Sequence, residues 1–98
     1  MPYTQTQIEA RGRLELLMDD IKATSRERNN LLRPLRERIH RALPVDSPPT
    51  AVARGFDFQA AGEELAAARR AGERLDALIE DYNALAPLAG QRPLPWGG

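Results

Sequence analysis

The sequence predicts an all-α fold, an antiparallel helical hairpin with coiled-coil-like packing, on the basis of three observations. An apolar stripe with regular steps of three and four residues fills the C-terminal half of the chain. A similar but interrupted pattern fills the N-terminal half, and a proline-rich segment lies between the two. Because an apolar helix stripe has to be buried against another element, the two halves are expected to fold back on each other.

The first arm is expected to begin at Thr4 or Thr6, since either hydroxyl can cap a helix, and Glu9 stands at the capping-box position for Thr6. Its row of seam residues follows steps of four and three residues up to the prolines, with polar residues at its centre. The row consists of Leu14, Met18, Ile21, Ser25, Arg28, Leu32, Leu35, Ile39 and Ala42.

Pro34 interrupts the first arm, because a proline inside a helix removes one hydrogen bond and clashes with the carbonyl four residues earlier. Two alternatives follow. The arm is either one long helix that is kinked near Asn29-Asn30, or two helices with Asn30 as the cap of the second. The first arm is therefore expected to be kinked or broken between Asn29 and Pro34.

Residues 44–56 form the predicted connector, and residues 1–87 form a single helical-hairpin domain followed by a Pro/Gly-rich tail at 88–98. Asp57 is expected to cap the last helix, which should end near Ala86 because Pro87 follows. The predicted stripe of this helix consists of Phe58, Ala61, Leu65, Ala68, Gly72, Leu75, Ile79, Tyr82 and Ala86.

Pairing the two stripes predicts a register for the hairpin. If Ala42 lies opposite Phe58, then Leu35 lies opposite Leu65, and Arg28 lies opposite Gly72, which leaves room for the arginine stem. The same register is expected to place Arg26 near the acidic residues Glu73 and Asp76.

The composition limits the function classes. The 14 basic and 14 acidic residues give zero net charge, and the absence of cysteine excludes disulfides and thiolate metal sites. No apolar run approaches the length of a membrane span, and the N-terminus lacks the features of a signal peptide. The sequence predicts a soluble protein that is cytoplasmic or part of a soluble assembly, with no membrane partner.

Catalytic chemistry is not expected. His40 is the only histidine, and no second histidine or cysteine is present to join it in a metal site or a catalytic pair. No phosphate-binding loop or nucleophile motif occurs. We therefore predict no catalytic, cofactor-binding or metal-binding residues, no cofactor and no enzyme activity.

Several leucines lie outside the predicted seam and widen the apolar stripe of the hairpin. They favour a second interface, either in a four-helix bundle of two hairpins or with another protein. Trp96, in the segment 92–96, either anchors a partner, folds back over the open end of the hairpin beside Met18 and Tyr82, or has no fixed position. The predicted interface residues are Leu17, Leu31, Leu78, Leu85 and Trp96.

The middle of the first arm carries an excess of basic residues, which gives a possible patch for an anionic ligand. Its members are Arg26, Arg33, Arg36, Arg38 and Arg41. Salt bridges within the chain or between subunits are the alternative use of these arginines.

The sequence thus favours a non-enzymatic protein–protein interaction module: an adaptor, assembly factor, inhibitor or structural subunit. Its partner would be another protein, a second copy in a homodimer or larger assembly, or both. The alternative is a helical dimer that binds nucleic acid through the arginine-rich segment 26–41.

Overall fold

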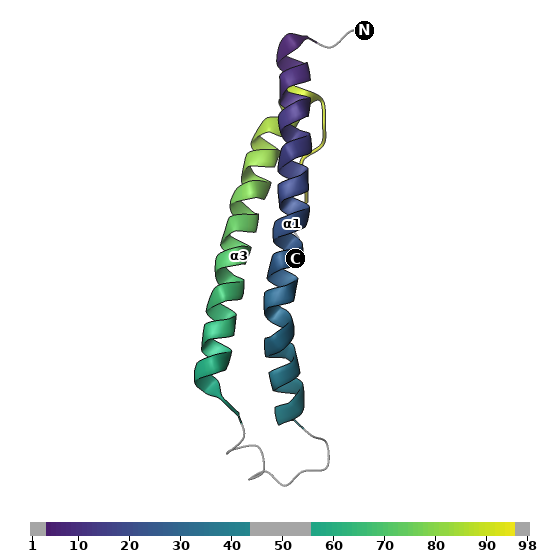
Figure 1. Ribbon diagram of the computed structural model, residues 1–98. Coiled ribbons are helices and arrows are strands. Elements are labelled where there is room, and N and C mark those ends of the chain that lie inside the picture. Colours follow the sequence, from purple (N-terminus) through teal and green to yellow (C-terminus); the bar gives the residue numbers. More distant parts are fainter. Residues whose placement is uncertain (1–3, 44–55, 96–98) are drawn as a thin grey trace.

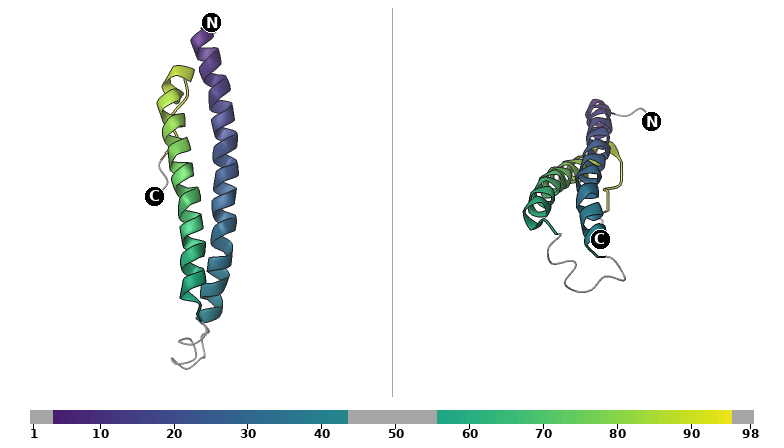
Figure 2. Two further views of the ribbon diagram at one scale, coloured as in Figure 1. Left: turned by 60° about the vertical axis from the view of Figure 1, so that its left-hand side comes forward. Right: turned by 60° about the horizontal axis from the view of Figure 1, so that its bottom comes forward.

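The fold is a hairpin of two long antiparallel helices, α1 (Gln5–Ala42) and α3 (Phe58–Leu85), which lie side by side (Figures 1 and 2). A short 3₁₀ helix, η1 (Ala86–Ala89), follows α3 directly. The computed structural model describes residues 4–43 and 56–95, so nearly all of the predicted connector lies outside the described residues. The predicted all-α helical hairpin is confirmed.

Thr4 caps the start of α1. Its hydroxyl accepts a hydrogen bond from the Gln7 N–H at 3.2 Å, and the Gln7 side-chain oxygen accepts one from the Thr4 N–H at 2.9 Å. This reciprocal pair is a capping box. The alternative cap at Thr6 is wrong because Thr6 lies inside the helix, where Glu9 accepts a hydrogen bond from the Gln5 amide instead.

Helix α1 continues through Pro34 without a break, so the division of the first arm into two helices is wrong. The ring removes one hydrogen bond, but Pro34 and Asn30 both lie on the exposed side, where water can reach the freed carbonyl. Helix α1 packs against α3 both before and after the proline, and this packing includes the ion pairs described below. These contacts support a continuous helix. The kink near this position remains a prediction.

Helix α3 begins and ends much as expected. The Asp57 carboxylate accepts a hydrogen bond from the Ala60 N–H at 2.9 Å, which confirms the predicted cap. At the other end the chain tightens into η1, and Gly90 follows with a φ of 71°. This left-handed conformation favours glycine and lets the chain turn back along the helices.

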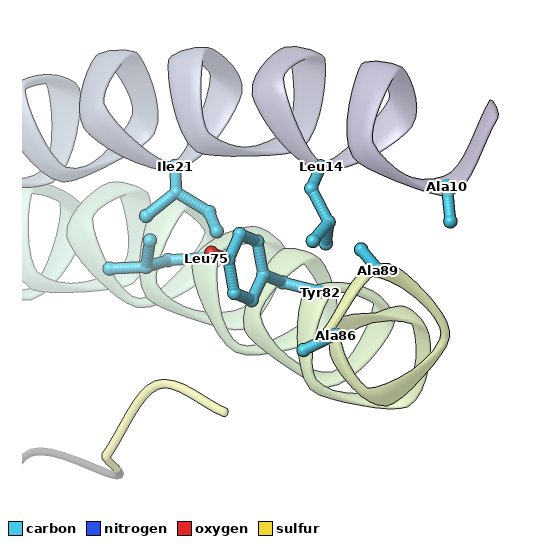
Figure 3. Close-up of a cluster of buried hydrophobic side chains, with 7 residues drawn as sticks. All are labelled: Ala10, Leu14, Ile21, Leu75, Tyr82, Ala86 and Ala89. Carbon is cyan, nitrogen blue, oxygen red and sulfur yellow. The ribbon is translucent and has the colours of Figure 1, made fainter. Parts of the chain in front are cut away.

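The apolar core occupies the end of the hairpin remote from the connector (Figure 3). Large side chains from both helices meet there, and small alanines from η1 close the end. The buried members are Ala10, Leu14, Ile21, Leu75, Tyr82, Ala86 and Ala89. Toward the connector the buried apolar residues of α3 are only Ala68 and Ala71, so large side chains contribute little to the core there.

The predicted seam is right in its central row and wrong beside it at the connector end. Ala68, Leu75 and Tyr82 are buried as expected, but Phe58 and Leu65 are exposed. At this end, the interface contains residues that follow a central-row residue by three positions, such as Glu64. The residues that follow by four positions lie outside it. The physical reason is an ion pair between the helices, which turns Glu64 inward and Leu65 outward.

The predicted register holds at Gly72, where a Cβ atom would lie 4.0 Å from Cδ of Arg28. The cross-helix ion pair at this level joins Glu27 of α1 to Arg74 of α3 at 2.8 Å. The expected nearness of Arg26 to Glu73 and Asp76 remains a prediction.

Leu14 and Leu16 provide a matched test of this fold, because they are close neighbours with 4% and 67% exposure. We expect Leu14→Ala to lower the free energy of unfolding by about 2–4 kcal/mol through lost burial and a cavity. Leu16→Ala should change it by less than about 0.5 kcal/mol. Urea unfolding followed by circular dichroism at the helical band measures both, and equal losses would contradict the described packing.

Candidate interaction surfaces

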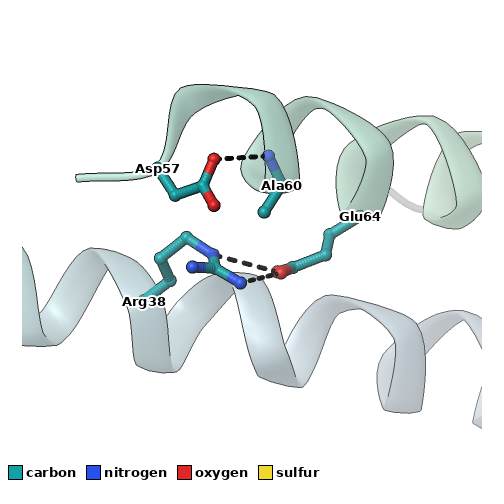
Figure 4. Close-up of polar contacts among 4 residues, drawn as sticks. All are labelled: Arg38, Asp57, Ala60 and Glu64. Carbon is teal, nitrogen blue, oxygen red and sulfur yellow. Dashed lines mark hydrogen bonds and ion pairs between the residues drawn. The ribbon is translucent and has the colours of Figure 1, made fainter.

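Arg38 of α1 and Glu64 of α3 form the polar contact that fixes the connector end of the hairpin (Figure 4). Arg38 donates from both Nε and Nη2 to the same oxygen, Oε1 of Glu64, with the Nε distance at 3.1 Å. Both side chains are largely covered, with 32% and 19% of their areas exposed. Since the remaining oxygen of Glu64 is buried without a partner among the described residues, the arginine is the main compensation for burying this carboxylate.

The carboxylate of Glu64 raises the pKa of the Arg38 guanidinium above its ordinary value, chiefly through the hydrogen bond and further through its charge and that of Asp57. Burial acts in the opposite direction. A basic group whose pKa is raised by folding stabilises the folded state at every pH below its pKa in the unfolded chain. This contribution is lost only as the pH rises through its pKa in the folded protein. Arg38 therefore stays positively charged, and so remains able to pair with Glu64, at any pH used for proteins.

Besides Leu43 (65% exposed), four large apolar side chains lie uncovered near the connector, and we name these four the connector-end patch. They are Leu32 (37% exposed), Ile39 (42%), Phe58 (75%) and Leu65 (54%). Leu32 and Ile39 are seven residues apart on α1, and Phe58 and Leu65 are seven apart on α3, so each pair forms one row along its helix. Leu32 and Leu65 line the same hollow, which places both rows on one side of the hairpin.

A second apolar surface lies nearer the termini, and we name it the leucine groove. Two adjoining hollows of about 460 and 390 Å³ share Asp20 and Asp81 at their borders. Leucines from both helices line it, namely Leu16, Leu17, Leu78 and Leu85. Leu17, Leu78 and Leu85 also pack against the core and are partly buried, whereas Leu16 is exposed.

The two surfaces are on opposite sides of the helix pair. On α1, Leu17 follows the seam residue Leu14 by three positions, whereas Leu32 follows the seam residue Arg28 by four. Side chains three and four positions after a seam residue lie on either side of it around the helix. Thus the leucine groove opens on one side of the hairpin and the connector-end patch on the other.

Of the predicted interface residues, Leu17, Leu78 and Leu85 come together in the leucine groove. Leu31 is half-buried on the same row of α1 as Leu17 but lines neither of the two hollows. Trp96 lies outside the described residues, so its role remains a prediction.

The C-terminal tail, as far as Pro95, folds back along the helices (Figures 1 and 2). Asn83 holds it through both faces of its amide: its oxygen accepts from the Leu94 N–H at 2.6 Å, and its nitrogen donates to the Leu94 carbonyl at 3.1 Å. Gln91 lines a hollow with Arg11, which shares a row with Leu32. Among the described residues, the tail therefore covers the terminal half of the side that carries the connector-end patch and leaves the connector half open.

The arginine patch is divided by the structure. Arg38 is engaged with Glu64, whereas the other four arginines are exposed and form no ion pair within residues 4–43 and 56–95. Lys22, Arg26, Arg33 and Arg36 follow one another on the outer side of α1. The result is a basic stripe that runs beside the connector-end patch.

The described residues contain no group of three or more acidic, histidine or cysteine side chains placed to hold a metal ion. His40 is exposed on the outer side of α1. Among the described helices, none has the length and apolar character needed to cross a membrane. Comparisons of the chain with models of protein families, with curated proteins and with solved structures find no match. The functional argument therefore depends on the two apolar surfaces and the charges around them.

The sequence reasoning missed the connector-end patch and the role of Asn83. All four patch residues were assigned to the seam. A signal that could have corrected this assignment is the possible pairing of Arg38 with Glu64, which lie within one helical turn of each other in the predicted register. No signal in the tail pointed to Asn83, because the contact is made to the backbone of Leu94.

Removing one partner of the Arg38–Glu64 pair tests its role. We expect Arg38→Ala to lower the melting temperature, because it leaves the Glu64 carboxylate buried and uncompensated. Replacing both residues by leucine should restore most of the loss. Arg69→Ala breaks the exposed pair with Glu73 and should have little effect. Thermal unfolding measured by circular dichroism decides this, and equal effects at Arg38 and Arg69 would refute the role.

Proposed function

We propose that this protein is a non-enzymatic protein–protein interaction module that binds its partner through the apolar sides of the helical hairpin. The observation that carries the proposal is the gathering of four exposed large apolar side chains in the connector-end patch. Single exposed leucines are ordinary on protein surfaces, whereas a contiguous apolar patch is typical of an interaction site.

The immediate surroundings of the patch support this proposal. Phe56 packs edge-on against Phe58 with 4.7 Å between ring centroids, so the patch extends into an aromatic pair. Aromatic side chains of this kind are frequent anchors at interfaces. Charged residues border the patch on both helices, which matches the usual arrangement of an apolar centre and a polar rim.

The leucine groove is proposed as a second contact surface of the same module. Its leucines contribute to the core, so a partner there would cover side chains that are already partly buried. Charged substitutions at Leu78 or Leu85 would disturb the fold as well as the surface, and Leu16 is the better probe because it is exposed.

The proposed function predicts that partner capture depends on the connector-end patch. In a pull-down with tagged chain as bait, Ile39→Ser combined with Phe58→Ser should weaken capture about tenfold or more, which corresponds to about 1.4 kcal/mol. Leu16→Ser is the matched control for the groove. Helicity should remain near the wild-type value in both variants. Equal capture of a protein by the wild-type chain and both variants would contradict the proposal. Failure of all three baits to capture any protein would also contradict it.

Binding of nucleic acid is the second candidate, and the observation that favours it is the basic stripe on α1, which forms no ion pair within the described part of the chain. Phosphate contacts release counterions, so this binding would weaken steeply as salt rises. We expect Arg33→Glu with Arg36→Glu to abolish retention of DNA or RNA at low salt and to reduce the salt slope. No retention of either nucleic acid by the wild-type chain would exclude this candidate.

A further inference from the structure

We propose that the leucine groove binds an amphipathic helix of a partner protein, and that this helix carries a lysine or arginine between two apolar side chains. The inference rests on the proposed function, because it assigns a ligand of defined pattern to the second contact surface. The position of Asp20 and Asp81 between the two hollows of the groove carries it.

Asp20 and Asp81 stand opposite each other on the two helices. Glu27 of α1 and Arg74 of α3 form an ion pair of 2.8 Å, so these two residues stand at the same height along the hairpin. Because the helices are antiparallel, Asp20 and Asp81 lie seven residues nearer the termini on their own helices, and so again share one height. Two turns away from an ion pair, the equivalent position thus holds two carboxylates.

The two carboxylates have no cation between them in the described part of the chain. Both aspartates are exposed, and neither takes part in an ion pair within residues 4–43 and 56–95. Aspartate is shorter than glutamate or arginine, so the space that Glu27 and Arg74 bridge stays open at this level, where the two hollows adjoin. The positive tip of a long side chain from a ligand can enter this space and pair with both carboxylates.

The other charges around the groove restrict the ligand further. Arg13 lines the hollow nearer the termini and Arg74 the other hollow, each about two turns from the aspartates, and Arg74 is engaged with Glu27. A ligand therefore gains from a basic residue at its centre but not from a second one two turns away. Within one turn of the aspartates, the remaining charged residues of both helices line neither hollow, and they are Asp19, Lys22 and Glu80.

The hollows on either side of the aspartates fit apolar side chains. Leu17 and Leu85 line the hollow of about 460 Å³ nearer the termini, and Leu78 lines the other, of about 390 Å³. The two hollows are centred about two helical turns apart, roughly 10 Å along the hairpin. In a helical ligand, two apolar residues seven positions apart span the same distance, and the basic residue falls three or four positions after the first.

A second copy of this chain fits the groove less well. Two grooves laid face to face, in either orientation, would bring the four aspartates together. On the opposite side of α1, Leu32, Arg36 and Ile39 have the spacing expected of the ligand. However, Arg28 lies about two turns before Arg36, so it would stand near the arginine at one end of the groove or the other, whichever way this row runs. A helix of another protein avoids both conflicts.

Binding of a designed peptide tests the proposal. The probe is a fluorescently labelled, alanine-rich helical peptide with leucines seven positions apart and a lysine four positions after the first leucine. The comparison peptide has glutamate in place of this lysine. Fluorescence anisotropy with the full chain should show that the lysine peptide binds about tenfold or more tightly than the glutamate peptide.

Variants of the chain assign this preference to the aspartates. Asp20→Asn/Asp81→Asn should abolish it, and Asp20→Lys/Asp81→Lys should reverse it in favour of the glutamate peptide. Asp19→Asn is the matched control, because Asp19 is the acidic neighbour of Asp20 and lines neither hollow. It should bind both peptides as the wild-type chain does. Circular dichroism checks that the helices are intact, and the asparagine variant keeps the test decisive if the lysine variant unfolds.

The outcomes separate this inference from the proposed function. Equal affinity for both peptides, binding of neither, or a preference that survives in the asparagine variant would overturn the inference. The proposed function still stands in that case if the connector-end patch captures a protein in the pull-down, and both fall if it captures none. Sedimentation equilibrium of the wild-type chain covers the remaining occupant: self-association that is lost in Asp20→Lys/Asp81→Lys would identify a second copy in the groove and overturn the separate partner.

Discussion

A pair of helices can cover only one stripe on each partner, and the rest of this structure follows from that constraint. The chain carries more apolar rows than one stripe can hold, because rows both three and four positions after the seam contain leucine or isoleucine. At the terminal end both flanking rows are partly covered, with help from η1 and the tail. At the connector end nothing among the described residues covers the outer row, which becomes the connector-end patch.

The two ends of the hairpin are consequently held by different forces. Near the termini, Leu14, Ile21, Leu75 and Tyr82 form an apolar core, whose burial is the main favourable term in folding. Near the connector the helices meet through small side chains and the Arg38–Glu64 pair. Because a covered ion pair returns little net stability after its desolvation, we expect the connector end to open at lower free energy than the terminal end.

Much of the fold could be predicted from the sequence because local rules decide it. Asp57 caps α3 and prolines mark the connector, and the spacing of Ala68, Leu75 and Tyr82 fixes the central row of the seam. The row beside it could not be chosen in the same way. Hydrophobicity alone favoured Leu65 over Glu64, whereas the outcome depends on Arg38 in the other helix. An ion pair between two helices does not show in the spacing of apolar residues along either helix.

The candidate surfaces show the same limit. Leu17, Leu78 and Leu85 were identified as a separate apolar face because their spacing is visible in the sequence, and the structure places them in one groove. The connector-end patch was hidden because its residues fit the seam pattern equally well. The direction in which Leu65 points is a property of the assembled pair, so the sequence of one helix could not reveal it.

Through the hydrogen bonds between Asn83 and Leu94, the hairpin binds its own C-terminal tail as it would bind a separate peptide. Asn83 contacts only the backbone groups of Leu94, eleven residues along the chain, much as a neighbouring β-strand would. A short tether of this kind gives an effective concentration on the order of millimolar, so even a weak intrinsic affinity keeps the segment docked. A free peptide would need a comparable concentration to displace it. Leu94 also packs against the apolar core, so this contact and the short tether together keep the tail docked.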